Sequence, residues 1–269
     1  MYYQIVIPVL NQLQYTQQCV DTLLAQGVAP GALLSIDNGS SDGTPAWLDS
    51  RPDLPSLRNP VNLGCGGAWT QGALAGDSTW VVLLNNDVVF GHDAIGRSLA
   101  AAERMGLDVV SPALVEGELD YDLTAFSERF GHEMTGQQRE NFFHGVCFAV
   151  RRQVFHRLGF FDTDRDLGGR EDTEFLFRCR RHGVTMAMVG DAVLHHYGSI
   201  TQKAMKLEQG VREFGDHRYL YGKLGLSWLG RQRFKHQRRQ RERQWRNAEL
   251  TAHGMTLHMD RRGGDWVYR

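Results

Sequence analysis

Lysine is absent from the first 202 residues of this 269-residue chain, and cysteine and proline are scarce, with four and seven copies. The cysteines are widely separated and show no CxxC pair or Cys/His zinc spacing, which excludes a disulfide scaffold and a structural zinc site. No window approaches the roughly 18 apolar residues of a membrane span. The first residues also lack the basic character of a signal peptide. We therefore expect a cytoplasmic protein with reduced thiols.

Two common phosphate-binding loops are also missing. The sequence contains no GxxxxGK[ST] motif. Its glycine-rich segment at 62–72 (NLGCGGAWTQG) lacks the GxGxxG spacing, and no strand leads directly into it. The first absence excludes a P-loop nucleotidase, and the second gives no support for a dinucleotide-binding fingerprint.

The charge is distributed unevenly, although the net charge is only −1. Residues 1–202 carry 14 basic and 24 acidic side chains, whereas residues 203–269 carry 16 basic and 7 acidic ones. So abrupt a change marks a boundary in the chain. We predict a domain over 1–202 and a basic, mostly helical extension over 203–269.

The first half alternates strand-like and helix-like segments. Strands are predicted at 4–9, 33–36 and 80–84, with helices at 15–26 and 45–49 between them. This alternation is typical of a parallel sheet covered by helices. The polar segment 116–141 predicts a long loop or short hairpins, and two short strands are expected at 185–189 and 192–194.

Polar residues follow the apolar run WVVLL at 80–84, where Asn85, Asn86 and Asp87 occur together. In a parallel α/β sheet, ligands bind at the carboxyl ends of the strands. Oxygen ligands of this kind suit Mg²⁺ or Mn²⁺ beside a diphosphate. The alternative is a simple strand-terminating turn, which Asn and Asp also favour.

Seven segments together resemble the inverting family 2 glycosyltransferases of the GT-A fold, in the family's order and across about residues 3–201. They are IVIPVLN (5–11), DNGSSDGT (37–44), NLGCGGAWTQG (62–72), LLNNDV (83–88), GVCFAVRRQVFHRLGFFD (145–162), REDTEF (170–175) and DAVLHHYGSIT (191–201). Three positions depart from the family pattern: Thr70 replaces an Asn, Asn85 the first Asp of D-x-D, and Glu174 an Asp.

This resemblance implies an α/β, Rossmann-like and mostly parallel central sheet flanked by helices. The nucleotide-sugar half would be 1–110 and the acceptor half 111–202. The implied activity is metal-dependent, inverting transfer of a hexose or deoxyhexose from a UDP- or dTDP-sugar. The acceptor would be a hydroxyl of a glycan or lipid-linked molecule in surface polysaccharide assembly. The N-x-D-V form is similar to that of rhamnosyltransferase-like members.

The resemblance also implies roles for single residues on the donor side. Asp37 would bind the base. The other residues implied to bind the nucleotide-sugar are Pro8, Asn11, Asp42, Asn62, Gly66, Asn85 and Asn86. Asp87 would be the main ligand of Mn²⁺ or Mg²⁺, and His195 a second ligand. His196 would take that place if the register slips by one residue.

On the acceptor side, the resemblance makes Asp172 the catalytic base. A base must reach the acceptor hydroxyl on the face of the donor opposite the departing diphosphate. Glu171 and His144 would bind the acceptor. The alternative for the two carboxylates is stabilisation of a helix N-terminus, where acidic residues complement the helix dipole.

Two other functions remain open. A GT-A module that binds nucleotide or glycan without catalysis is disfavoured, because Asp87, Glu171 and Asp172 are all present. A nucleotidyltransferase is disfavoured, because the chain has no basic, glycine-rich phosphate loop near residue 1.

The basic run at 231–246 contains eight Lys or Arg residues against one Glu, with Phe234 and Trp245 between them. It predicts either a helix on the anionic inner face of a membrane, or a solvated or subunit-packing helix of a homo-oligomer. Nucleic acid is disfavoured as a partner, since no nucleic-acid module accompanies the run.

Overall fold

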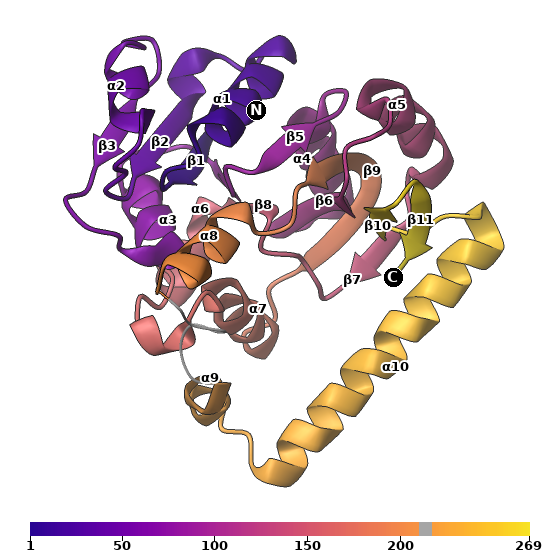
Figure 1. The fold of residues 1–269 in the computed structure, drawn as a ribbon. Coiled ribbons are helices and arrows are strands. Elements are labelled where there is room, and N and C mark those ends of the chain that lie inside the picture. Colours follow the sequence, from indigo (N-terminus) through magenta and orange to yellow (C-terminus); the bar gives the residue numbers. More distant parts are fainter. Residues whose placement is uncertain (210–216) are drawn as a thin grey trace.

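A single mixed β-sheet of eleven strands forms the centre of the computed structural model, which describes residues 1–209 and 217–269 (Figure 1). Its main path runs β11-β10-β6-β8-β4-β1-β2-β3, and β9 pairs with β5, β6 and β7. The strands are β1 (Tyr3–Val9), β2 (Leu33–Asp37), β3 (Ser56–Arg58), β4 (Trp80–Leu84), β5 (Val88–Phe90), β6 (Val109–Gly117), β7 (Gln138–Glu140), β8 (Cys147–Arg151), β9 (Met186–His196), β10 (His258–Arg262) and β11 (Asp265–Tyr268).

The sheet is parallel in its first half and mixed in its second, where β6 is parallel to β9 and β10 but other pairs are antiparallel. Strand β1 is parallel to β2 and β4, as predicted, but β8 is antiparallel to both β4 and β6. The prediction of a mostly parallel sheet is therefore wrong for the second half. Hydrophobic periodicity identifies a strand but does not determine its direction, which depends on how the chain crosses between strands.

Helices cover both faces of this sheet. Along β1, Ile5 and Ile7 belong to one apolar cluster and Val6 to the other, because successive strand side chains point to opposite faces. Helices α1 (Leu13–Ala25), α4 (Ala94–Met105) and α5 (Leu123–Met134) pack on the first face. Helices α3 (Gly64–Leu74), α6 (Arg152–Leu158) and α7 (Glu171–Arg181) pack on the second. The layered α/β prediction is confirmed.

Two local predictions were wrong. Helix α5 lies within the segment predicted as loop or hairpins, where Phe126, Phe130 and Met134 repeat every four residues and are buried. The strand β9 is continuous where two short strands were expected, and its pairing with β6 shifts register between Pro112 and Ala113. The chain therefore passes from one predicted strand to the other through this irregularity in the pairing, without leaving the sheet.

The C-terminal region begins with α8 (Ile200–Gln209) and α9 (His217–Lys223), and α10 (Trp228–His253) then runs along the outside of the molecule (Figure 1). The helical prediction is correct for these segments and wrong for 258–268, where β10 and β11 join the central sheet. Strand β10 is parallel to β6. Residues 210–216 of the predicted extension lie outside the described residues. The domain boundary at 202/203 stays a prediction.

Helix α10 is fixed to the sheet through a buried ion pair. The Arg139 guanidinium donates to both oxygens of Glu249, at 2.7 and 2.8 Å. Both side chains are almost fully buried, so the pair is desolvated and has the bidentate geometry that makes such contacts strong. In the described part of the chain, no helix is long and apolar enough to cross a membrane.

Candidate active site

A cavity of about 340 Å³ opens at the carboxyl ends of β1 and β4. Pro8 of β1 and the turn Asn85–Asp87 after β4 form one side of it. Asn62 before α3, Glu171 at the start of α7, and Met205 of α8 also line it. Five residues predicted for the donor or metal site, and Glu171, therefore meet here.

Asp87 is buried in this wall, with 3% of its surface exposed. Its Oδ1 lies 3.2 Å from Nε2 of His196, and its Oδ2 accepts a hydrogen bond from the Ile200 backbone N–H at 2.9 Å. Burial would raise the pKa of Asp87, but the hydrogen bond from His196 lowers it below its ordinary value. The carboxylate is therefore ionised at neutral pH.

His196 connects Asp87 to a further carboxylate. Its Nδ1 lies 3.1 Å from Oε1 of Glu116, whose Oε2 lies 3.0 Å from Nε2 of His258. Burial alone would lower the pKa of His196, but hydrogen bonds to Asp87 and Glu116 raise it to about 9. A continuous chain of charged hydrogen bonds thus fixes the orientation of Asp87.

His195, the predicted second metal ligand, lies elsewhere. Its Nδ1 bonds to the Tyr121 hydroxyl at 3.0 Å and its Nε2 to the Gly117 carbonyl at 3.2 Å. The side chain is fully buried, which lowers its pKa to about 4. With both ring nitrogens bonded to protein, His195 is a structural residue. The structure places its neighbour His196 against Asp87.

The donor set at Asp87 fits a divalent cation. The Asp87 carboxylate is the kind of hard oxygen ligand that Mn²⁺ and Mg²⁺ bind, whereas His196 is protonated between two carboxylates and orients Asp87. The Asn85 side chain lines the cavity and forms no hydrogen bond within the described residues. One protein carboxylate would leave most of the coordination sphere open to phosphate oxygens and water.

Three residues predicted to bind the nucleotide instead organise the loop beside the cavity. The Asn11 side chain accepts from the backbone N–H of Ser41 at 2.7 Å. Asp42 accepts from Leu13 N–H at 3.1 Å, which joins the same loop to α1. Asp37 is fully buried, and its Oδ2 accepts from Arg58 at 3.2 Å. None of the three lines the 340 Å³ cavity, so a contact with the base stays a prediction.

Asn86 and Gly66 also have packing roles. Asn86 donates to the Thr16 hydroxyl at 2.9 Å and accepts from Thr201 at 3.4 Å, which connects α1 to α8. A Cβ atom at Gly66 would lie 2.8 Å from Cγ of Glu171. Glycine is therefore required there for α3 to approach the start of α7.

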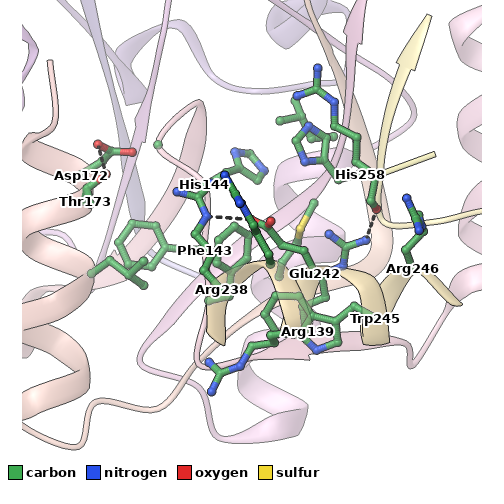
Figure 2. Close-up of a pocket in the computed structure, with 18 of the residues that line it drawn as sticks. Arg139, Phe143, His144, Asp172, Thr173, Arg238, Glu242, Trp245, Arg246 and His258 are labelled. Carbon is green, nitrogen blue, oxygen red and sulfur yellow. Dashed lines mark hydrogen bonds and ion pairs between the residues drawn. The ribbon is translucent and has the colours of Figure 1, made fainter. Parts of the chain in front are cut away.

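A larger groove, of about 950 Å³, lies between α7, the loop before β8, and α10. Figure 2 shows Asp172 and Thr173 on one side of this groove, His144 in the middle, and Arg246 and His258 on the other side. The basic run of α10 therefore faces the predicted catalytic base. The membrane-surface and subunit-interface predictions for 231–246 stay untested.

Asp172 lies at the edge of the groove in the first turn of α7. Its Oδ1 accepts from the Thr173 hydroxyl at 3.3 Å. Burial raises its pKa above the ordinary range of an aspartate. A Cβ atom at Gly145 would overlap the Asp172 carboxylate and lie 2.7 Å from its Cβ, so a glycine at 145 leaves room for the Asp172 side chain.

Consecutive carboxylates therefore face different cavities. Glu171 lines the smaller cavity beside Asp87, and Asp172 lines the larger groove. Neighbouring helix positions are about 100° apart, so one turn of α7 serves both spaces. The structure places Glu171 on the Asp87 side, away from the predicted acceptor contact.

His144 does line the groove with Asp172, as predicted. Its Nε2 lies 2.8 Å from the Pro112 carbonyl, and burial lowers its pKa to about 3. The ring is therefore neutral. It carries its proton on Nε2, because only that nitrogen faces a carbonyl.

A family model described as glycosyl transferase family 2 matches residues 4–159. The chain belongs to this family. It is a glycosyltransferase, and the enzyme prediction is confirmed.

Two sequence relatives and one solved structure are similar to this family 2 enzyme. It is 30% identical to an N-acetylglucosaminyl-diphospho-decaprenol L-rhamnosyltransferase of Mycobacterium tuberculosis, over 62% of this chain and 67% of the relative. It is 28% identical to succinoglycan biosynthesis protein ExoO of Rhizobium meliloti, over 46% of this chain and 36% of that protein. It also resembles the solved mannosyltransferase of Pyrobaculum calidifontis in complex with GDP-Man and Mn²⁺. There the TM-score is 0.57 at 18% identity, over 77% of this chain and 60% of that one. This last likeness confirms a GT-A-like fold.

Glu116 and Gly145 were missed as site residues. Glu116 lies opposite His196 in the parallel pairing of β6 and β9, and no spacing in the sequence reveals that contact. Gly145 does stand in a motif segment, but its role depends on the nearness of α7. Only knowledge of which residues pair between β6 and β9 would have placed Glu116 beside His196.

Proposed function

We propose that this family 2 enzyme transfers a hexose or deoxyhexose, with inversion, from a UDP- or dTDP-sugar to a hydroxyl of a glycan or lipid-linked acceptor in surface polysaccharide assembly. The observation that carries this proposal is the division of Glu171 and Asp172 between two cavities. A transferase must hold a donor and an acceptor on opposite sides of one reacting carbon, and the first turn of α7 separates two such spaces.

In this mechanism, the nucleotide-sugar occupies the cavity lined by Asp87 and Glu171. Asp172 takes the proton from the acceptor hydroxyl as the oxygen attacks the anomeric carbon. The bond to the diphosphate breaks on the opposite face, so a single displacement inverts the configuration. Glu171 lies on the donor side, where its carboxylate would accept hydrogen bonds from sugar hydroxyls.

The proposed metal ligand is Asp87, which His196 orients, with Asn85 beside it. A bound Mn²⁺ or Mg²⁺ would neutralise charge on the departing diphosphate. Asp87 is ionised and held by Ile200 N–H and His196, so little of its orientation has to be fixed when a donor binds.

Slow hydrolysis of the donor tests this proposal. We expect the protein with Mn²⁺ to release free sugar from at least one UDP- or dTDP-sugar in a panel, because water can replace the acceptor. EDTA should abolish this release. Failure to bind or hydrolyse any nucleotide-sugar in the panel would favour a module without catalysis.

The raised pKa of Asp172 predicts the pH dependence of transfer. The base must be ionised, so kcat/KM should fall as the pH drops through its pKa. Because burial raises that pKa, the acid limb should lie above the value of about 3.9 for an exposed aspartate. The measurement is kcat/KM against pH for wild type and for Glu171→Gln. If the acid limb disappears in Glu171→Gln, the titrating group is Glu171, and the assignment of the limb to Asp172 is wrong.

A further inference from the structure

Arginines dominate the wall of the larger groove. Eight of them line it, against three acidic residues, Glu116, Asp172 and Glu242. Most of the arginines come from α10, where the groove-lining positions 234, 237, 238, 241, 242, 245 and 246 fall on one face of the helix, and Arg239 and Arg243 extend the lining beyond that face. The basic run therefore presents charge to the groove that Asp172 also lines.

Three of these arginines already have carboxylate partners. Arg139 pairs with Glu249, Arg238 with Glu242 at 2.7 Å, and Arg269 with Glu116 at 3.3 Å. The other five form no ion pair with any described residue: Arg180, Arg239, Arg241, Arg243 and Arg246. The groove thus has a surplus of guanidinium groups that the protein itself does not neutralise.

Arg180 shows how closely these charges lie. It extends from α7 over the Phe177 ring, and it donates to the Asn141 carbonyl at 2.8 and 2.6 Å. Burial, with the nearby positive charges of Arg241 and Arg238, lowers its pKa to about 10. A group of guanidiniums that repel one another is stabilised when an anion binds among them, and phosphate is the anion that arginine recognises bidentately.

The aromatic side chains between the arginines define the rest of the ligand. Trp245 lies 5.7 Å from Phe142, and Phe234 lies 4.9 Å from Phe177, measured between ring centroids. All four rings line the groove. Such surfaces pack against the faces of sugars or against apolar chains.

We propose that this arginine groove binds the acceptor by a phosphate or diphosphate group attached to its sugar, and so positions the sugar hydroxyl at Asp172. The proposal rests on the proposed function above and narrows its acceptor to phosphorylated molecules. The phosphate can belong to a prenyl-linked sugar or to a water-soluble one. Arg238 and Asp172 line the same groove, so one groove offers both an anion-binding side chain and the proposed base to such an acceptor.

Binding of diphosphates without metal tests the groove separately from the donor site. Inorganic pyrophosphate and farnesyl diphosphate are titrated into the full chain in EDTA, with calorimetric detection. The groove variant is Arg238→Gln/Arg241→Gln. The matched control is Arg233→Gln/Lys235→Gln, which removes the same charge from exposed positions of α10 outside the groove.

We expect the groove variant to bind pyrophosphate at least about tenfold more weakly than wild type, and the control to lose less than about twofold. Tighter binding of farnesyl diphosphate than of pyrophosphate would indicate a prenyl-linked acceptor, and equal binding a soluble one. Equal losses in the two variants, or no binding by wild type, would overturn the proposal.

Two further measurements separate the alternatives. If the groove variant loses binding to vesicles of anionic phospholipid while its pyrophosphate affinity stays that of wild type, the arginines serve a membrane surface and the proposal is wrong. Donor hydrolysis by wild type in Mn²⁺ reports on the proposed function. If wild type does not hydrolyse any donor but binds pyrophosphate in an arginine-dependent way, the proposed glycosyl transfer is wrong and the arginine groove is still an anion-binding site.

Discussion

Asp172→Asn is expected to lower sugar transfer by about a hundredfold or more, the scale of general base catalysis, while the affinity for the donor nucleotide stays almost unchanged. The amide keeps the size of the side chain but cannot take the proton of the acceptor hydroxyl. Donor affinity is preserved because Asp172 faces the larger groove and not the cavity of Asp87. The measurements are the transfer rate and the nucleotide dissociation constant.

Asp166→Asn is the matched control, since it makes the same substitution at an exposed position in the segment before α7. Gly145→Ala offers an independent test, because its added Cβ would displace the Asp172 carboxylate without removing it. We expect this variant to lose transfer as well and to keep nucleotide binding. Near-wild-type turnover in Asp172→Asn would mean that the carboxylate only stabilises the start of α7.

Asp87→Ala is expected to remove the metal-dependent part of nucleotide binding, and with it donor hydrolysis. Asp87 is the one carboxylate in the Asn85–Asp87 turn, so its loss leaves no charged oxygen ligand in that turn. Titration of UDP and dTDP with and without Mn²⁺ measures this effect. Wild type should bind more tightly with Mn²⁺, whereas the variant should bind equally in both conditions.

Asp53→Ala serves as the control for this variant, because it removes an exposed carboxylate that pairs only with Arg51 on the surface. Its nucleotide affinity should still respond to Mn²⁺. If Asp87→Ala binds both nucleotides as tightly as wild type in saturating Mn²⁺, Asp87 is a turn residue and the metal lies elsewhere.

Part of the cavity could be predicted from strand pattern. The run at 80–84 is apolar throughout and buried, and the polar residues after it had to emerge at the carboxyl edge of the sheet. Local pattern and sheet topology agree there. Pro8 and Asn62, which also line the cavity, were predicted from the family resemblance. Asn11, Asp37 and Asp42 were predicted in the same way and do not line it, because their side chains bond to backbone N–H groups and to Arg58.

The contribution of the C-terminal region could not be predicted. The segments HMDRR and DWVY alternate poorly and are rich in charge, so they carry no strand pattern. They form strands because β6 offers a free edge, and because Arg269 pairs with Glu116 and Asp260 across it. The weak strand propensity of these two segments is therefore overridden by their pairing within the sheet. The adjacent histidines posed a similar problem, since only the β5–β9 pairing decides which ring faces Asp87.

The pairing of β10 with β6 has a consequence for how the enzyme becomes active during folding. His258 reaches Glu116 across 142 residues of sequence. Contacts so distant in the chain form slowly, because a long loop must be closed before they stabilise anything. The hydrogen-bond chain that runs from His258 through Glu116 and His196 to Asp87 is therefore complete only after the last strands have docked. In a refolding experiment, Mn²⁺-dependent nucleotide binding should recover later than helical content.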